Sequence, residues 1–352
     1  MARIAVIPGD GIGPEVVAEG LKVLQAAAEV EDLAFDTVTF DYGAERYLKD
    51  GTTLPDAGLA ELRDEFDAIL LGALGDPRIP DMRHGREILL RLRFDLDLFI
   101  NLRPVRLLDA ALCPLKGKGP KEVDMVVFRE NTEGIYVGAG GNFKKDTPDE
   151  VAIQEDVNTR KGVERIIRAA FEYAKAHGRG SVCMSDKSNA MRFAGDLWQR
   201  TFKAVAADYP KIEAFHLFVD VLTMELVRAP ERFEVIVTNN LFGDIVTDLG
   251  AQIAGGIGLA ASGNIHPGGS ALFEPVHGSA PDIAGQGVAN PLATILSIQM
   301  LLEHLGHPGA AARVDAAVRR ALDEKVLTRE LGGDRSTKEV GDFVAAAVRA
   351  PT

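Results

Sequence analysis

Short apolar runs alternate with segments that have a helical hydrophobic period along most of the chain. This alternation is typical of an α/β fold. The runs predict strands at 3–8, 34–40, 67–74, 98–107, 123–130, 151–157, 180–186, 233–239 and 271–277. The helical period predicts helices at 14–28, 56–65, 84–95, 159–177, 190–208, 241–254, 291–305 and 309–324.

The sequence indicates the domain organisation less clearly than it indicates the helices and strands. The chain has 352 residues, a length that favours about two domains. A Gly-rich and charged segment at 138–150 predicts an exposed loop or arm. The chain has no obvious linker, which is expected where two domains are interleaved in sequence.

The composition narrows the class of protein. The formal net charge of −13 argues against nonspecific nucleic-acid binding, which needs a basic surface. Two cysteines, Cys113 and Cys183, are too few for a disulfide scaffold and favour a reducing, cytoplasmic location. No apolar run reaches about 18 residues, and the chain starts directly with a strand, so we expect neither a membrane span nor a signal peptide.

A glycine-rich turn, Gly9-Asp-Gly-Ile-Gly-Pro14, joins the first strand to the first helix. It departs from the dinucleotide fingerprint G-x-G-x-x-G, because Pro14 stands where the third glycine belongs. Alone, it equally fits a plain turn in which glycines supply unusual φ values and Pro14 begins the helix.

Two aspartates follow the apolar run at 233–239. Asp244 and Asp248 are four residues apart on a predicted helix, so they share one face and repel each other unless a cation lies between them. Carboxylates at this spacing suit Mg²⁺ or Mn²⁺. A third carboxylate, Asp220, closes what we interpret as an apolar strand and could join them; an unrelated pair of surface acids is the alternative.

Three arginines lie in apolar surroundings, at positions 93, 103 and 129. A buried guanidinium needs an anionic partner. One such arginine usually makes a structural ion pair. Three beside a possible metal suggest a substrate with two or more carboxylates, which arginine binds through paired hydrogen bonds.

Two further residues could move protons. Tyr136 follows a strand and lies among glycines, and Lys187 lies at a strand-to-helix turn. Each could serve as a general acid or base, although a solvent-facing role is the more common one.

A loop of about 18 residues, 273–291, is long enough to suggest a function. His277 and Asp282 lie in it, and an aspartate can accept a hydrogen bond from the 2′-hydroxyl of an NAD ribose. We interpret the remaining histidines, which are His84, His177, His216, His266, His304 and His307, as surface residues.

Six motifs together resemble one family. "GDGIGPE", "NLRPVRL", "RENTEGIY", "DKSNA", "NLFGDIVTDL" and "EPVHGSAPDIAGQG" occur in the order seen in the β-decarboxylating dehydrogenases, which act on 3-isopropylmalate, isocitrate, homoisocitrate, tartrate and D-malate. The resemblance spans nearly the whole chain. It implies the α/β, isopropylmalate/isocitrate dehydrogenase-like two-domain fold with a large mixed sheet flanked by helices, and not a Rossmann fold.

The resemblance also implies domain boundaries and an assembly. The cofactor-side domain would comprise 1–98 plus 254–352, and the substrate, metal and dimerisation domain 99–253. The protein would be a homodimer in which Lys187 and Asp220 act across the interface, with no nucleic-acid or membrane partner.

Residue roles follow from the matching positions. The acid/base pair would be Tyr136 and Lys187, and the ligands of Mg²⁺ or Mn²⁺ would be Asp220, Asp244 and Asp248. Substrate contacts would be Leu89, Leu90, Arg93, Arg103, Arg129 and Asn189. Contacts to NAD would be Ile12, Glu274, His277, Gly278, Ser279, Ala280, Asp282, Ile283 and Asn290. We expect NAD, since NADP-using isocitrate members carry Lys-Tyr where this chain has Asp282-Ile283.

The resemblance implies a 2-hydroxy diacid as the substrate, and the substituent at its C3 is harder to assign. Isocitrate enzymes place Ser and Asn where this chain has Glu87 and Leu89, so a third carboxylate would be repelled. Leu89 and Leu90 suit an isopropyl group, which favours oxidative decarboxylation of 3-isopropylmalate to 4-methyl-2-oxopentanoate in leucine biosynthesis. Ala190 leans instead toward the tartrate and D-malate members. Arg86 and Arg91 could favour homoisocitrate.

Two other classes remain open on the sequence. A metal-dependent phosphatase could use the aspartates for Mg²⁺ and the arginines for phosphate, but it leaves the loop at 273–291 unexplained. A non-catalytic subunit is disfavoured because every position expected to be catalytic is present.

Overall fold

The computed structural model describes residues Met1–Pro351, which form two compact units. Unit 1 comprises Met1–Leu98, Leu107–Pro120 and Ala251–Thr352, and unit 2 comprises Phe99–Arg106 and Lys121–Gly250. Both units are therefore interleaved in sequence, which explains why no linker is visible. The segment 107–120 lies in unit 1, whereas the sequence analysis placed it in the second domain. The functional roles expected of the two domains stay a prediction.

Unit 1 contains five strands of a large mixed sheet, in the order β2-β1-β3-β12-β11. β1, β2, β3 and β12 are parallel neighbours, and β11 is antiparallel to β12. The strands are β1 (Ala2–Gly9), β2 (Phe35–Thr39), β3 (Ala68–Ala73), β11 (Ala261–Ile265) and β12 (Ala271–Pro275). β3 and β12 are buried throughout, as expected for central strands covered on both faces.

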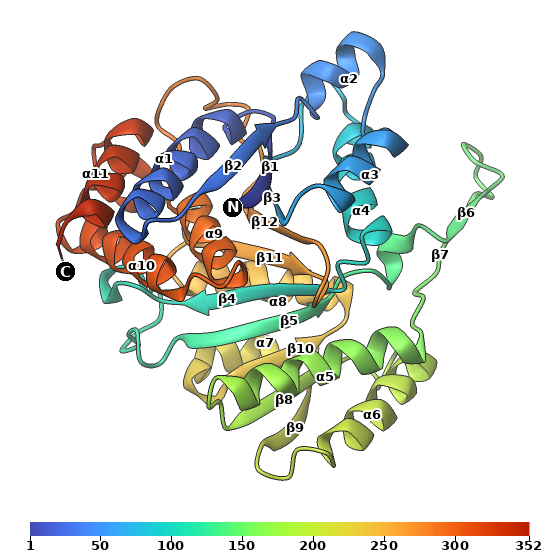
Figure 1. Ribbon diagram of the computed structural model, residues 1–352. Helices are drawn as coiled ribbons and strands as arrows, with labels where there is room; N and C mark the ends of the chain where they lie inside the picture. The colour runs from blue at the N-terminus through green and yellow to red at the C-terminus, as the bar shows by residue number, and fades with distance from the viewer. Residues whose placement is uncertain (352) are drawn as a thin grey trace. The chain divides into compact units, whose positions relative to one another are not determined.

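The helices of unit 1 are α1 (Gly13–Glu31), α2 (Ala44–Asp50), α3 (Asp56–Asp64), α4 (Arg83–Asp95), α9 (Leu292–His304), α10 (Pro308–Asp323) and α11 (Thr337–Arg349). Short 3₁₀ segments lie at Ala110–Leu112, Ile257–Leu259 and Arg329–Leu331. Helix α1 packs beside α9, α10 and α11 (Figure 1). Helix α9 is buried along nearly its whole length, because it lies between this helical layer and the sheet.

Unit 2 contains the order β4-β5-β10-β8-β9, in which β4 is antiparallel to β5 and the other neighbours are parallel. Its strands are β4 (Ile100–Arg106), β5 (Asp124–Glu130), β8 (Ser181–Asp186), β9 (Glu213–Phe218) and β10 (Val235–Thr238), and its helices are α5 (Arg160–Ala176), α6 (Arg192–Ala206), α7 (Val219–Arg228) and α8 (Asn240–Ile253). Helices α5 and α6 lie side by side (Figure 1). Two 3₁₀ segments lie at Ile135–Val137 and Pro230–Arg232.

The predicted arm of unit 2 is a two-stranded antiparallel hairpin of β6 (Gly140–Phe143) and β7 (Val151–Gln154). All eight strand residues are exposed, and the hairpin projects from the strands and helices of its unit (Figure 1). The apolar side chains of Phe143, Val151 and Ile153 are exposed with it.

Two sequence interpretations are wrong. The segment containing Asp220 is not the end of a strand: β9 ends at Phe218, and Asp220 lies in the first turn of helix α7. The histidines are not all at the surface. His84 is fully buried, and His216, His266, His304 and His307 are partly buried, whereas His177 is exposed.

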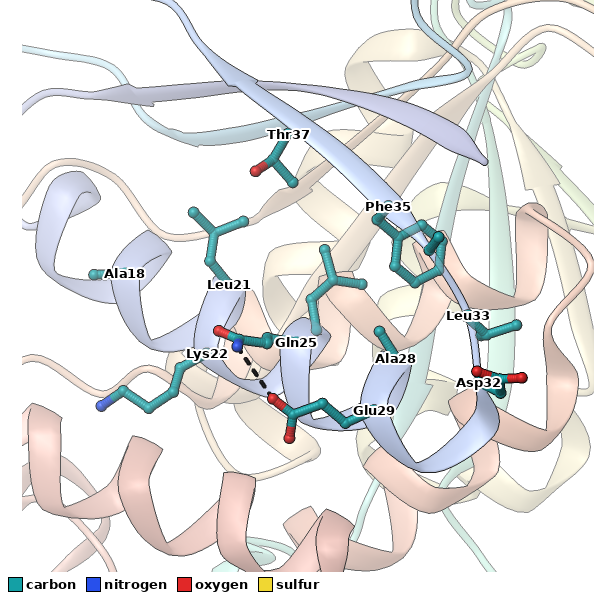
Figure 2. A pocket seen from close by; sticks show the side chains of 12 residues that line it. Ala18, Leu21, Lys22, Gln25, Ala28, Glu29, Asp32, Leu33, Phe35 and Thr37 are labelled. Atoms are coloured by element: carbon teal, nitrogen blue, oxygen red, sulfur yellow. Dashed lines mark hydrogen bonds between the residues drawn. The ribbon is translucent and has the colours of Figure 1, made fainter.

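No helix among residues 1–351 is long and apolar enough to cross a membrane. A groove of about 730 Å³ runs between α1 and the edge strand β2 in unit 1. Leu21, Gln25 and Ala28 of α1 face Phe35 and Thr37 of β2 across it (Figure 2). None of the predicted site residues lines this groove, so it is separate from the candidate chemistry.

Candidate active site

In unit 2, the structure brings together five of the predicted site residues from four segments. Arg103 comes from β4, Arg129 from β5, Tyr136 from the 3₁₀ turn after β5, and Asp244 and Asp248 from α8. Strand register places β4 against β5, with Arg103 opposite Val127. We call these five residues the Arg–Tyr–Asp cluster.

Asp244 is the centre of this cluster. Its Oδ1 forms an ion pair with Nη1 of Arg129 and lies 3.7 Å from Nη2 of Arg103. Its Oδ2 accepts a hydrogen bond of 3.1 Å from the Tyr136 hydroxyl. Burial alone would raise the pKa of Asp244. The charges of Arg129 and Arg103, with the hydrogen bond from Tyr136, instead hold that pKa below its usual value, so the carboxylate is ionised.

Asp248 is in the opposite electrostatic situation. Its Oδ1 lies 3.9 Å from Nη1 of Arg103, and more than half of its side chain is exposed. Partial burial and the negative charge of Asp244 raise its pKa above the ordinary value. Two carboxylates one helical turn apart therefore repel each other, as predicted, and the pair presents oxygen ligands suited to a hard cation.

Arg129 is held in place by a side chain that the sequence analysis missed. Arg129 is 1% exposed, and its Nε donates to Oδ1 of Asn240 at 2.9 Å. Nδ2 of Asn240 donates in turn to the backbone carbonyl of Glu133 at 2.9 Å. Asn240 thus joins β5, the loop before Tyr136 and the start of α8. A second asparagine directly after the strand is the only sequence signal for it.

The loop before Tyr136 is fixed by Glu130, which the sequence analysis also missed. Its carboxylate accepts hydrogen bonds from the backbone and hydroxyl of Thr132 and from the backbone of Glu133. Burial is the largest influence on Glu130 and raises its pKa. The guanidinium of Arg129 lies over the Tyr136 ring, 5.3 Å from its centre.

Lys187 and Asp220 form a separate pair in unit 2. The Lys187 Nζ lies 2.7 Å from Oδ2 of Asp220, and this contact lowers the pKa of Asp220. Among residues 1–351, no group of three or more His, Cys, Asp or Glu side chains is placed to hold a metal ion. Asp220 therefore does not join Asp244 and Asp248 within one chain. Asn189 lies exposed in the turn after Lys187.

In unit 1, Arg93 lies on α4 and is nearly fully buried. Its Nη2 makes a 2.9 Å ion pair with Oε1 of Glu274, which also accepts from Asn264. Leu89, one turn before Arg93, packs on the hydrophobic cluster of β1, β3, α3 and α4, and Leu90 is partly buried. Glu274, predicted to contact the cofactor, is thus engaged by Arg93.

The glycine-rich turn behaves as its residue types predict. Gly9 and Gly11 have φ values of +72° and +57°, and Pro14 stands in the first turn of α1. A Cβ on Gly11 would lie 2.0 Å from the Ser279 carbonyl oxygen, so only glycine permits this approach.

The glycine-rich turn is hydrogen-bonded to the long loop between β12 and α9. The Ile12 amide donates to the Ser279 carbonyl at 2.8 Å, and the Glu15 carboxylate accepts from the amides of Gly285 and Gly287. Ile12 packs with Ala280 and Ile283 of the loop, among other residues.

Other predicted cofactor contacts lie in the same loop. Burial lowers the pKa of His277, and its Nε2 is buried with no hydrogen-bond partner. Gly278 and Asp282 are exposed. The Asn290 side chain is occupied, because it donates to the Gly258 carbonyl and accepts from the Leu292 amide.

The comparisons with known proteins agree with this fold. A sequence model of the isocitrate/isopropylmalate dehydrogenase family matches residues 3–344. The chain belongs to this family, and it is an oxidoreductase of the dehydrogenase class.

Three relatives illustrate the similarity. The chain is 54% identical to the 3-isopropylmalate dehydrogenase of Thermobifida fusca over 348 residues, covering 98% of this chain and 97% of that protein. It is 53% identical to the 3-isopropylmalate dehydrogenase of Streptomyces coelicolor, covering 98% of each chain. Among solved structures, isocitrate dehydrogenase from Methylococcus capsulatus superposes with a TM-score of 0.89 at 38% identity, covering 99% of this chain and 100% of that chain.

Proposed function

We propose that the protein catalyses the NAD-dependent oxidative decarboxylation of 3-isopropylmalate to 4-methyl-2-oxopentanoate, the reaction expected in leucine biosynthesis. The observation that carries this proposal is the Arg–Tyr–Asp cluster. Two buried guanidinium groups, a phenol and two carboxylates within one unit match the needs of a dicarboxylate substrate that must be held and protonated. The names of the relatives at 54% and 53% identity support the same substrate.

The chain's own residues have separable tasks. Arg103 and Arg129 bind substrate carboxylate oxygens, a task that their fixed positions on adjacent strands suit. The Tyr136 hydroxyl already carries its proton toward an anion, Asp244, and is the acid that protonates the substrate carbon after CO₂ has left. Arg93 contributes a further guanidinium from α4.

A divalent cation fits the donor set. The raised pKa of Asp248 reflects burial and an unbalanced neighbouring charge, and a cation between Asp244 and Asp248 would relieve that repulsion. With Mg²⁺ or Mn²⁺ held by these carboxylates, the site would gain a Lewis acid able to lower the pKa of the substrate's C2 hydroxyl and to stabilise the negative charge of decarboxylation.

The third ligand supports a homodimer. Lys187 and Asp220 lie together but apart from the other two aspartates. A second copy of the chain would supply this pair, with Lys187 accepting the proton of the C2 hydroxyl. Helix α7, which carries Asp220, exposes the apolar side chains of Val221, Met224 and Val227, and unit 2 also exposes Ile245 of α8. Contiguous exposed apolar residues of this kind mark a protein interface.

The loop between β12 and α9 fits NAD. His277 offers a buried, unpartnered Nε2, and the exposed Asp282 carboxylate suits a ribose 2′-hydroxyl and repels a 2′-phosphate. The turn at Ile12 that closes on this loop adds an apolar contact. Bound NAD⁺ would supply the acceptor for the C2 hydride.

The alkyl substituent at C3 is favoured over a third carboxylate. Leu89 and Leu90 provide apolar surface beside Arg93, and Glu87 adds a negative charge to the same helix. Arg91 does not support the homoisocitrate alternative, because its guanidinium is occupied by Asp56, Asp95 and the Leu54 carbonyl.

The activity is tested by following NADH absorbance and CO₂ release with 3-isopropylmalate, with Mg²⁺ and then with EDTA. We expect equimolar NADH and CO₂ that disappear with EDTA. Release of phosphate from a phosphate ester, without NADH formation, would favour the hydrolase alternative. Undiminished activity in EDTA would contradict the role of the aspartates.

A further inference from the structure

The position of Lys187 depends on how two strand ends are held. Lys187 directly follows Asp186, the last residue of β8, and Asp220 lies two residues after β9. β8 and β9 are parallel, with Asp186 opposite Phe218, so both segments leave the sheet at the same edge. The 2.7 Å contact between Lys187 and Asp220 therefore spans the ends of two adjacent strands.

A single buried carboxylate joins the elements around this contact. Oδ1 of Asp186 accepts 2.8 Å and 3.0 Å hydrogen bonds from Nε2 of His216 on β9 and from the Ser188 amide. Oδ2 accepts a 3.0 Å bond from Nε2 of Gln199 on α6. Burial would raise the pKa of Asp186, but these hydrogen bonds, with His216 first, hold it below the ordinary value. The carboxylate thus stays ionised and links β9, the Lys187 turn and α6.

The turn that carries Lys187 is held on its other side by backbone contacts. The Lys187 carbonyl accepts from the amides of Ala190 and Met191 at 2.9 Å and 2.8 Å. Helix α6 packs so closely that a Cβ on Gly195 would lie 2.3 Å from Cβ of Ser188. The turn is therefore fixed to α6 by its backbone and to β9 by the Asp186–His216 hydrogen bond.

His216 suits this role because it is not a deep core residue. Its side chain is 24% exposed, and its ring meets Phe218 edge-on with centroids 5.0 Å apart. Replacing it removes a hydrogen bond without opening a large cavity. Its contribution can therefore be separated from global stability.

We propose that Asp186 and His216 are positioning residues that hold Lys187 for proton transfer. This inference rests on the proposed function, in which Lys187 accepts the proton of the substrate hydroxyl. Neither residue needs to touch the substrate, since the Asp186 oxygens are already occupied by three donors. Their effect reaches the reaction only through the position of Lys187.

The test is a double-mutant cycle. His216→Phe removes the donor to Asp186, and we expect kcat to fall by about 10- to 100-fold, the range expected when a reacting group is displaced by about 1 Å. KM for NAD and the thermal midpoint should stay close to wild type. His216→Gln, whose amide can donate to Asp186, should restore most of the lost kcat. In a Lys187→Ala background, His216→Phe should cause no further loss.

A matched control exists in unit 1. Nδ1 of His266 donates a hydrogen bond of 2.9 Å to the Asp97 carbonyl and lies 3.5 Å from the Asp97 carboxylate. His266→Phe removes a comparable His–Asp contact and should leave kcat unchanged.

The outcomes separate the two proposals. A loss from His216→Phe that persists in the Lys187→Ala background, or that appears in KM for NAD and the thermal midpoint together with kcat, would overturn the positioning role. An Asp186→Asn variant with wild-type kcat would overturn it too. Wild-type kcat in Lys187→Ala would instead overturn the catalytic role of Lys187, and the positioning role with it.

Discussion

Arg129→Met removes a buried guanidinium while nearly preserving side-chain volume. The groups that lose a partner include Oδ1 of Asn240, 2.9 Å from Nε, and the Asp244 carboxylate. A buried acceptor left unsatisfied costs about 1–3 kcal/mol. Breaking a buried ion pair costs about 3–5 kcal/mol. The cost of breaking the ion pair is smaller here, because the Asp244 side chain is 39% exposed and Arg103 remains 3.7 Å away.

The net loss of unfolding free energy is therefore about 3–5 kcal/mol, with little cavity cost. The entropy of unfolding is about 2.1 cal/mol/K per residue, which for 352 residues corresponds to about 1.4 °C per kcal/mol, so the thermal midpoint should fall by about 5 °C at pH 7. Circular dichroism measures this midpoint. Arg200→Met is the control, since Arg200 makes an exposed ion pair with Asp196 that is worth at most about 1 kcal/mol.

The effect should depend on pH with a defined sign. The pKa of Asp244 is lowered in the folded protein, so its stabilisation is complete above the unfolded pKa of about 3.9 and is lost as pH falls through the folded value. The difference between wild type and Arg129→Met should accordingly shrink below about pH 4. A midpoint for Arg129→Met within about 2 °C of Arg200→Met at pH 7 would refute the reasoning.

Three further predictions concern local packing and charge. Gly243→Ala should lower the thermal midpoint, because the added Cβ would lie 2.5 Å from Cγ of Arg129. This clash should outweigh the helix preference of alanine over glycine, which is about 1 kcal/mol. A higher midpoint would contradict the packing. Asp248→Asn should slightly raise the thermal midpoint in EDTA, because the ionised form of Asp248 is disfavoured in the folded protein. The same change should weaken the stabilisation by added Mn²⁺. A lower midpoint in EDTA would contradict the electrostatics. Burial raises the pKa of the Cys183 thiol to about 12, so a thiol reagent at pH 8 should modify Cys113 and leave Cys183 intact until the protein is denatured. Rapid modification of Cys183 in the folded protein would be inconsistent with its burial.

Most strands of both units could be predicted because they are short apolar runs between turn residues, but β6, β9 and β11 were not predicted. Helix α7 could not be predicted, because its sequence has the β-branched and apolar content of a strand. Its apolar side chains Val221, Met224 and Val227 are also exposed. Because this apolar face of α7 is not packed against the rest of the chain, the hydrophobic period of the segment does not match that of a helix packed on a core. Asp220 was therefore placed on the wrong kind of element.

The charged residues of the cluster could be predicted because a buried arginine requires an anion, and Asp244 provides it. The long-range contacts that hold buried charged residues in place could not be predicted. Arg93 meets Glu274 at a separation of 181 residues, and the fully buried His84 bonds with Asp10 at a separation of 74. Such pairs depend on which strands become neighbours, and the polar sequence around His84 suggests a surface position.

The central claim is that this chain oxidises a 2-hydroxy diacid with an alkyl substituent. It is tested most directly by kcat/KM from NADH appearance, with Mg²⁺, for 3-isopropylmalate, D-malate, tartrate, isocitrate and homoisocitrate. We predict a preference of about 100-fold or more for 3-isopropylmalate over D-malate, equivalent to nearly 3 kcal/mol of transition-state stabilisation from apolar contacts such as Leu89 and Leu90. Equal values, or a higher value for D-malate or tartrate, would contradict the alkyl pocket and the role in leucine biosynthesis.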